Sequence, residues 1–274
     1  MVIRELVTEI SHILIENAAF EAQQIVMSAA GMNNTEFVLN QGAVLTGKTV
    51  KAAREMTERR VEGEPLQYII GTAGFMGLEF KVNKNVLIPR ADTETLVEEV
   101  LRLMGGKCAE VLDIGTGSGC IGISIAHFNR NAEVTFLDIS KAALETAEEN
   151  AVLNGVGGEF IHMDILNECP DKKFDIIVSN PPYIRPEVIA SLQTEVKDYE
   201  PYGALCGGSD GLDFYRRITD IAPKMLKRNG VLAFEIGYDQ GKEVSDMMTA
   251  FTDVRVVKDL CGNDRVVTGI LDTV

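Results

Sequence analysis

The sequence lacks the long hydrophobic runs and the leader that would direct a chain to a membrane. Its uncharged apolar stretches, of which residues 119–126 are among the longest, fall short of the roughly 18 residues that a membrane-spanning helix needs. The first residues, Met1 to Glu5, turn acidic and polar at once, so they lack the build of a signal peptide. We therefore expect a cytoplasmic protein without a membrane segment.

Cysteine and histidine are also scarce. The chain has five cysteines, an odd number, and three histidines, and they are scattered without a pair at the spacing of metal ligands. We therefore expect reduced thiols and no bound metal.

An excess of positive charge is missing as well. The net charge is -15, and residues 1–85 carry 8 Lys and Arg against 10 Asp and Glu, which leaves 18 against 31 in the remainder. Affinity for nucleic acid comes largely from neutralising phosphates with basic side chains. The second part of the chain would repel DNA or RNA, which argues against a nucleic-acid partner without excluding one.

What is present first is a helical pattern in residues 1–65. Ile3, Leu6, Val7 and Ile10 recur at helical spacing, and residues 48–61 form a charged helical segment. Between them the break at residues 31–34 leaves Asn34 or Thr35 to cap the next helix. We predict a small helical bundle, a substrate-docking domain, at residues 1–65.

The pattern then changes to strands. Short β-prone runs at 68–70, 74–82 and 86–88 predict a β-hairpin linker over residues 66–90. Residues 91–274 alternate between helices and strands, as in a mostly parallel α/β sheet. We expect strands at 111–114, 134–138, 159–162, 174–178 and 231–235, helices at 93–104, 121–128, 141–153 and 212–226, and an antiparallel hairpin within 254–270.

A glycine-rich segment, residues 113–119 with the sequence D-I-G-T-G-S-G, lies where a predicted strand becomes a helix. Glycines let the backbone approach a ligand closely, and the following helix begins with free N–H groups. The next predicted strand ends, 19 residues beyond Gly119, in a carboxylate that could accept hydrogen bonds from two ribose hydroxyls. The pattern predicts a nucleotide-type cofactor held by Asp113, Gly115, Thr116, Gly117, Ser118, Gly119 and Asp138.

Two features favour S-adenosylmethionine over NAD or FAD. The spacing is G-x-G-x-G rather than the G-x-G-x-x-G that cradles a pyrophosphate, and the negative charge of Asp113 suits the cationic methionine end of S-adenosylmethionine. Asp164 closes the third strand and is placed to accept from the adenine amino group, although a solvated loop carboxylate fits that spacing equally well. Ile165 could form an apolar wall for the adenine.

The reaction motif is Asn180-Pro181-Pro182-Tyr183, directly after the fourth predicted strand, where parallel sheets gather their ligand-binding residues. A substrate –NH2 could donate one hydrogen to the Asn180 side chain and one to the Pro181 carbonyl, with the ring of Tyr183 against the planar group. Such a clamp predicts methyl transfer to a planar amide or amine nitrogen through positioning and electrostatics. A rigid Pro-Pro turn that merely caps the strand is the alternative.

With these motifs the chain resembles the HemK/PrmC family of release factor protein-(glutamine-N5) methyltransferases. The likeness covers nearly the whole chain. It rests on the two motifs above and on the segments Glu64–Gly71, Phe75–Phe80, Val86–Arg90, Tyr199–Pro201, Gly207–Gly211 and Gly262–Arg265.

The resemblance implies a Rossmann-like class I S-adenosylmethionine-dependent methyltransferase domain after the helical domain. It implies methylation of the glutamine of the Gly-Gly-Gln motif in class 1 peptide-chain release factors, with S-adenosylhomocysteine as product. We also expect the protein to be a monomer. Residues 180–183 would bind the glutamine amide. Arg90 is a weaker candidate for the cofactor carboxylate, because a structural ion pair explains it equally well.

Two positions depart from the family's pattern. Ala91 stands where a proline is frequent, and Ile165 stands where an aromatic residue is frequent beside the adenine. The second change replaces stacking by apolar contact, which would weaken cofactor binding by roughly 0.5–1.5 kcal/mol.

Two other classes of function stay open on the motifs alone. An exocyclic amine of a nucleic-acid base is also a planar –NH2 group, so a nucleic-acid amino methyltransferase fits the reaction motif. A non-enzymatic binding protein with a nucleotide fold fits the glycine-rich turn. Charge and the linker resemblance speak against the first, and the intact reaction motif speaks against the second.

Overall fold

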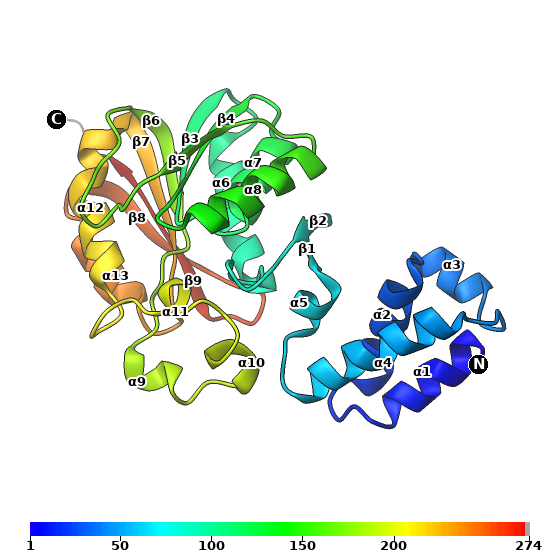
Figure 1. Cartoon of the computed structure of the whole chain (residues 1–274). Helices are drawn as coiled ribbons and strands as arrows, with labels where there is room; N and C mark the ends of the chain where they lie inside the picture. Colours follow the sequence, from blue (N-terminus) through cyan, green and yellow to red (C-terminus); the bar gives the residue numbers. More distant parts are fainter. Residues whose placement is uncertain (272–274) are drawn as a thin grey trace. The chain divides into compact units, whose positions relative to one another are not determined.

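The computed structural model describes residues 1–271, which form two compact units (Figure 1). The first unit comprises Met1–Thr72 and Gln193–Tyr199, and the second comprises Ala73–Leu192 and the described chain from Glu200 onward. Within residues 1–271, no helix combines the length and the apolar character needed to cross a membrane.

The first unit is helical. Ile3, Leu6 and Ile10 of its first helix are fully buried and pack with Ala22 and Ile25 of the second, so the apolar positions expected from helical spacing form this unit's core. Its helices are α1 (Ile3–Ser11), α2 (Ala18–Ala30), α3 (Asn34–Leu39), α4 (Gly47–Val61), α5 (Leu66–Ile70) and α10 (Thr194–Lys197).

The start of α3 corrects one prediction. Asn33, not Asn34 or Thr35, caps this helix: its Oδ1 accepts the backbone N–H of Glu36 at 2.9 Å, and Glu36 Oε2 accepts the backbone N–H of Asn33 at 2.9 Å. The carboxylate three residues after Asn33 decides the start, because it closes this reciprocal capping box.

The segment predicted as a β-hairpin linker contains more than strands. Residues 68–70, predicted as a β-prone run, belong to helix α5, and residues 86–88 form no strand. Leu66 and Ile69 explain the helix, because their three-residue spacing buries both on one side, and Gly71 ends it at a φ of 88°. A two-stranded sheet of β1 (Thr72–Phe75) and β2 (Leu78–Lys81) follows. The predicted division at residues 65 and 90 stays a proposal.

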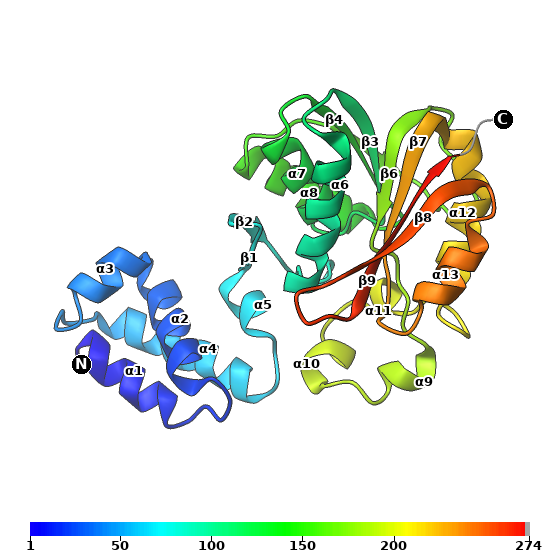
Figure 2. The same cartoon turned by 180° about the vertical axis from the view of Figure 1, so that it is seen from behind.

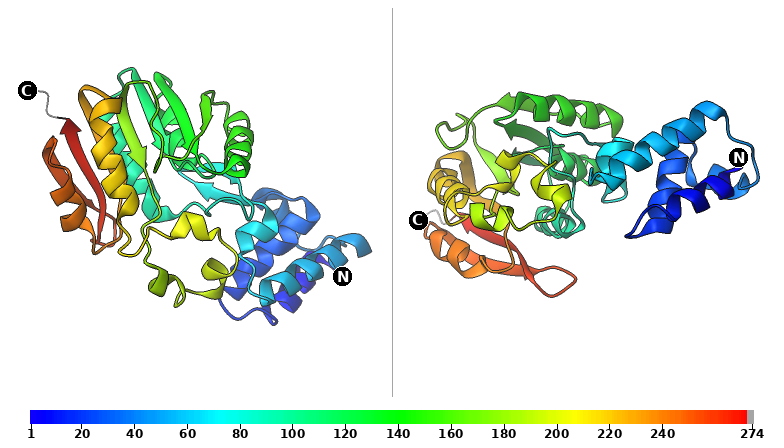
Figure 3. Two further views of the ribbon diagram at one scale, coloured as in Figure 1. Left: turned by 60° about the vertical axis from the view of Figure 1, so that its left-hand side comes forward. Right: turned by 60° about the horizontal axis from the view of Figure 1, so that its bottom comes forward.

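The second unit is built on a seven-stranded sheet within the described chain. Its order is β5-β4-β3-β6-β7-β9-β8, with β9 antiparallel to both of its neighbours and the other pairs parallel. The expected terminal hairpin is therefore present, at the edge of the sheet (Figure 3). The strands are β3 (Ala109–Ile114), β4 (Ala132–Asp138), β5 (Glu159–His162), β6 (Phe174–Ser179), β7 (Leu226–Glu235), β8 (Phe251–Lys258) and β9 (Asp264–Leu271).

Helices cover both faces of this sheet (Figures 1 and 2). Alternate strand residues face opposite ways: Val111 packs with α6 (Glu94–Met104) and α7 (Cys120–Phe128), while Leu112 packs with α12 (Asp213–Met225). The remaining elements are η1 (Ala91–Thr93), α8 (Lys141–Leu153), α9 (Pro186–Ile189), α11 (Tyr202–Leu205) and α13 (Gly241–Met247).

The strand order places the ends of β3 and β6 at a switch point. The chain leaves β3 toward β4 on one side, and it leaves β6 toward β7 on the other, which opens a crevice beyond the carboxyl ends of the two central strands. Ser179 Oγ, at the end of β6, donates to the backbone carbonyl of Ile114 at the end of β3, at 2.7 Å. The two sequence motifs therefore start side by side.

A buried arginine connects three segments of the first unit. Arg60 of α4 donates from Nε and Nη2 to the carboxylate of Glu21 on α2, at 2.7 and 3.0 Å, and from Nη2 to Glu195 of α10 at 2.6 Å. Its side chain is 11% exposed. Removing it leaves the buried Glu21 carboxylate without its partner, which is costly.

We expect Arg60→Ala to lower the free energy of unfolding by about 1–3 kcal/mol. Arg54→Ala is the matched control, since Arg54 lies on the same helix and pairs with Glu9 at the surface, where ion pairs contribute little. Urea unfolding followed by the helical circular dichroism signal measures both. Equal losses for the two variants would contradict a structural role of Arg60.

Candidate active site

The glycine-rich turn lies between β3 and α7, and each of its glycines has a positive φ. The values are 71° for Gly115, 55° for Gly117 and 82° for Gly119, a region that side chains other than glycine rarely adopt. A Cβ on Gly115 or Gly117 would meet no atom within 4 Å, whereas one on Gly119 would lie 2.7 Å from Ile123 Cδ1. The first two glycines therefore leave open space, and the third allows close helix packing.

Asp113 holds this turn from inside. Its carboxyl is fully buried, and Oδ2 accepts from Thr116 Oγ1 at 2.7 Å and from the backbone N–H of Gly122 at 3.1 Å. Burial raises its pKa to about 6, against the lowering effect of these two hydrogen bonds. Asp113 does not itself line the adjoining cavity. Its carboxyl acts on the shape of the turn.

Asp138 ends β4 beside the same turn. Its Oδ2 accepts the backbone N–H of Gly117 at 2.9 Å and its Oδ1 that of Ser140 at 2.8 Å, and burial raises the pKa of the carboxyl. Each carboxylate oxygen can accept a further hydrogen bond. Asp138 also lines the cavity, so it is held rigidly while keeping acceptor capacity toward a ligand.

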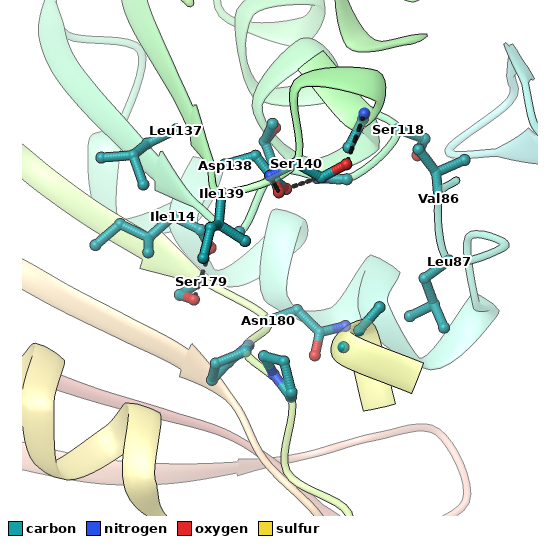
Figure 4. A pocket seen from close by; sticks show the side chains of 18 of the residues that line it. Val86, Leu87, Ile114, Ser118, Leu137, Asp138, Ile139, Ser140, Ser179 and Asn180 are labelled. Atoms are coloured by element: carbon teal, nitrogen blue, oxygen red, sulfur yellow. Dashed lines mark hydrogen bonds between the residues drawn. The ribbon is translucent and has the colours of Figure 1, made fainter. Parts of the chain in front are cut away.

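The cavity itself has a volume of about 280 Å³ and lies at the switch point of the sheet (Figure 4). Figure 4 shows the ends of β4 and β6 contributing Asp138 and Asn180 to it. Eleven of the predicted site residues line it: Arg90, Gly115, Thr116, Gly117, Ser118, Asp138, Asp164, Ile165, Asn180, Pro181 and Pro182. Three do not: Asp113, Gly119 and Tyr183.

Asn180 presents its amide at the cavity wall. Its Nδ2 donates to Thr93 Oγ1 at 3.3 Å. Within residues 1–271, no group donates a hydrogen bond to Asn180 Oδ1 or to the backbone carbonyl of Pro181. Two consecutive residues that line the cavity therefore keep free acceptors, as expected for holding the two hydrogens of an –NH2 group.

Tyr183 points elsewhere. Its ring packs against the hydrophobic core formed with α12, its backbone carbonyl accepts from Gln240 Nε2 at 3.2 Å, and burial raises the pKa of its hydroxyl. A Cβ on Gly207 or Gly211 would meet the backbone of Tyr183 within 2.7 Å. In this structure Tyr183 anchors the end of the motif instead of covering a planar group in the cavity.

Arg90 lines the cavity, and it forms an ion pair, which was the predicted alternative to binding the cofactor carboxylate. Its Nη2 lies 2.6 Å from Glu200 Oε1, and the Glu200 side chain is 1% exposed. The guanidinium is thus committed to a buried carboxylate.

Asp164 and Ile165, which were predicted to contact adenine, both line the cavity. Asp164 closes a turn, since its Oδ1 accepts from the backbone N–H of Leu166 at 3.0 Å and its Oδ2 accepts from Asn167 Nδ2 at 2.6 Å. Ile165 is 5% exposed. Phe214 of α12, which the sequence did not indicate, lines the same cavity. An aromatic ring therefore reaches the cavity from α12.

Two further residues near Asn180, Thr93 and Glu235, were not predicted from the sequence. Thr93, at the end of η1, is buried and contacts Asn180, and Glu235 ends β7 with 2% exposure. Burial raises the pKa of Glu235 to about 7, although a hydrogen bond from Thr93, the charge of Arg265 and a hydrogen bond from Asn180 lower it. Glu235 could have been predicted from the sequence, because it follows an apolar strand segment in the same way as Asp113 and Asp138 do.

Metal ligands do not cluster in the described part of the chain. Among residues 1–271 no group of three His, Cys, Asp or Glu side chains is arranged to hold a metal ion.

Comparison with known proteins agrees with this geometry. Residues 2–71 match the family model of the PrmC N-terminal domain, and residues 91–195 match that of the methyltransferase small domain. A release factor glutamine methyltransferase of Geobacter sulfurreducens is 42% identical over 93% of this chain and 90% of its own length. One of Flavobacterium psychrophilum is 47% identical over 75% of each chain.

The chain belongs to the release factor glutamine methyltransferase family. The resemblance inferred from the motifs is thus confirmed, and the chain is a methyltransferase. Among solved structures, a methyltransferase from Pyrococcus furiosus matches with a TM-score of 0.53 at 18% identity, over 73% of this chain and 92% of that one.

A T. thermophilus 16S rRNA N2 G1207 methyltransferase, solved with AdoMet and guanosine, matches with a TM-score of 0.51 at 18% identity, over 73% of this chain and 50% of that one. These two structures, together with the sheet order, confirm the class I methyltransferase fold of the second unit.

The buried carboxyl of Asp113 makes stability depend on pH. In the folded chain it keeps its proton up to about pH 6, but in the unfolded chain only up to about pH 4, so its contribution is present at pH 4 and is lost as the pH rises through 6. We expect the stability of the wild type relative to Asp113→Asn to fall by about 2 kcal/mol from pH 4 to pH 7.

Urea unfolding of both proteins across this range measures the difference. Asp175→Asn is a control of opposite sign, because hydrogen bonds from Lys227 and the backbone of Glu110 outweigh burial and lower the pKa of Asp175. A pH-independent difference between wild type and Asp113→Asn would mean that the Asp113 carboxyl stays ionised.

Proposed function

We propose that this chain methylates the side-chain amide nitrogen, N5, of the glutamine in the Gly-Gly-Gln motif of class 1 peptide-chain release factors, with S-adenosylmethionine as methyl donor. One observation carries the proposal: Asn180 and Pro181 both line the cavity, and no group among residues 1–271 donates to Asn180 Oδ1 or to the Pro181 carbonyl. A primary amide brings the two N–H groups that these acceptors require. The names of the curated relatives support the substrate.

The residues at the other end of the cavity fit S-adenosylmethionine. A Cβ at Gly115 or Gly117 would fill space that a ligand needs, and Asp138 retains acceptor capacity that suits ribose hydroxyls. Ile165 and Phe214 supply an apolar slot and Asp164 an acceptor for adenine, while Asp113 shapes the turn. When bound, S-adenosylmethionine supplies a methyl group already activated by its sulfonium and leaves as S-adenosylhomocysteine.

The chain's own contribution to the reaction is orientation. An amide nitrogen is a poor nucleophile because its lone pair is delocalised into the carbonyl. Asn180 Oδ1 and the Pro181 carbonyl draw on its two hydrogens, which raises the electron density on nitrogen and fixes its direction. As the bond from nitrogen to the methyl carbon formed, the bond from the methyl carbon to sulfur would break, and one of these hydrogens would pass as a proton to water. Pro182 keeps the acceptors rigid because its ring fixes the backbone.

The helical first unit, which matches the PrmC N-terminal domain, would dock the release factor. We propose that the protein acts in the cytoplasm, where release factors work, as a monomer and without direct contact to nucleic acid, consistent with its net charge of -15.

The decisive experiment is methyl transfer from tritiated S-adenosylmethionine. We expect label in purified class 1 release factor, none in a release factor whose Gly-Gly-Gln glutamine is replaced, and none in DNA or ribosomal RNA. Asn180→Ala should lower the rate by about 100-fold or more, as removal of one transition-state contact does elsewhere, while the circular dichroism spectrum is retained.

Label in nucleic acid but not in release factor would replace the proposed substrate with an exocyclic amine. Undiminished transfer by Asn180→Ala would remove Asn180 from the site. Failure of the wild type to bind S-adenosylmethionine in calorimetry would favour a binding protein without this activity.

The glycine turn gives a separate test of the cofactor. Gly117→Ala and Gly105→Ala place a side chain at nearly the same backbone angle, φ of 55° and 56°, with no atom within 4 Å in either case. Both should lose about 1 kcal/mol of stability. Only Gly117 lines the cavity, so only Gly117→Ala should weaken S-adenosylmethionine binding, by about tenfold or more in calorimetry. Equal affinities of the two variants would place the cofactor elsewhere.

A further inference from the structure

Asn180 has an ambiguity that its own contacts do not resolve. An asparagine amide has an acceptor oxygen and a donor nitrogen of nearly equal shape, and only the oxygen can hold a substrate –NH2 group. The nitrogen lies against Thr93 Oγ1 at 3.3 Å. A hydroxyl both donates and accepts, so Thr93 alone would accept from Nδ2 or donate to Oδ1 with similar ease. A further group next to Thr93 must therefore determine which amide atom of Asn180 faces the Thr93 hydroxyl.

Glu235 lies at the position from which this decision can be made. The parallel register pairs Ser179 of β6 with Phe234 of β7, so the next residues, Asn180 and Glu235, leave the two strands side by side. Thr93 and Asn180 lie close enough to the Glu235 carboxyl for their side chains to lower its pKa. Glu235 is 2% exposed, and its Oε2 has no hydrogen-bond partner among the described residues.

A buried carboxyl with an unsatisfied oxygen is costly, so its retention needs an explanation. The charged groups around it supply only part of the compensation. Arg265 of β9 is the nearby cation, and it is itself shared with Asp92 at 3.0 Å and Asp259 at 3.1 Å. The Asp92 carboxyl, the Cys120 thiol and the hydroxyls of Tyr183 and Tyr215 also interact electrostatically with Glu235. Arg265, the nearby cation, already pairs with two other carboxylates, so an ion pair does not explain why Glu235 is buried here.

We propose that Glu235 is a positioning residue: its carboxylate takes the Thr93 hydroxyl hydrogen and an Asn180 Nδ2 hydrogen, and thereby turns Asn180 Oδ1 toward the substrate. An ionised carboxylate can only accept. It therefore forces the Thr93 hydroxyl to spend its hydrogen on Glu235 and to accept from Asn180 Nδ2. The flipped amide would place its oxygen against two acceptors and is excluded.

A protonated Glu235 would lose this selectivity, because a carboxylic acid can also donate. Since burial raises the pKa of Glu235 to about 7, the protonated form gains population as the pH falls through 7. Methyl transfer should therefore decline on the acid side with a midpoint near 7, in kcat rather than in the KM for S-adenosylmethionine, whose proposed site lies around Asp138.

The inference rests on the proposed function, so its test has one arm without turnover. In protein labelled with 15N-asparagine, the Nδ2 hydrogens of Asn180, assigned by their loss in Asn180→Ala, should shift with a midpoint near pH 7. Glu235→Gln should abolish this shift. This result would support the network even if release factor were not the substrate, whereas an unchanged titration in Glu235→Gln would overturn it.

The second arm measures methyl transfer to release factor. Glu235→Gln keeps the shape but offers Thr93 both a donor and an acceptor, so kcat should fall by about 10- to 100-fold, the loss of one hydrogen bond to a charged group. The acid limb near pH 7 should disappear, and affinity for S-adenosylmethionine should stay within about twofold. Glu99→Gln, which removes another buried carboxylate of the same unit outside the cavity, is the matched control.

Thr93→Val provides a second route should Glu235→Gln fold poorly. Removing the hydroxyl breaks the same relay, so Thr93→Val should lower kcat to a similar extent, and the double variant should be little worse than either single one. Additive losses in the double variant, or a kcat and acid limb in Glu235→Gln equal to those of the wild type, would overturn the proposal.

Discussion

The parallel pairing of β3 with β4 on one side and β6 on the other is the constraint on which the rest of the site depends. It brings the glycine-rich turn, Asp138 and Asn180 to one edge of the sheet, although they are separated by up to 65 residues along the chain. The hydrogen bond from Ser179 Oγ to the Ile114 carbonyl ties the two central strand ends at that edge. A cavity at this switch point therefore follows from topology before any side chain is considered.

Three carboxyl groups lie at or next to the ends of β3, β4 and β7 at this edge, and their hydrogen-bond partners differ. Asp113 accepts from Thr116 and the α7 backbone with one oxygen, and Asp138 accepts from the turn and Ser140 with both of its oxygens. Asp113 and Glu235 each keep one oxygen without a partner among the described residues. All three have raised pKa values because burial disfavours their charge. Similar strand-end acids thus serve distinct ends: one shapes a turn, one faces the cavity, and one lies behind Asn180.

The sequence predicted the alternating architecture, the terminal hairpin and most residues of the cavity wall, because strand periodicity and strand-end motifs are local signals. It failed where tertiary packing decides. Residues 68–70 look β-prone, but burial of Leu66 and Ile69 makes them helical. Phe214 and Thr93 reach the cavity only through the packing of α12 and η1, which no local pattern encodes. Tyr183 belongs to the motif by sequence, yet its ring completes the hydrophobic core.

The chemistry proposed for this site leaves the protein one main task. The methyl donor is activated by its own sulfonium, and a proton departs from the amide without a strong base at hand, so rate must come from the direction and electron density of one nitrogen. Two acceptors set both, and one of them is an amide that could turn over. Control of that single torsion is therefore as important as the acceptor itself. This explains why a costly buried carboxylate is kept behind Asn180, where it touches no substrate.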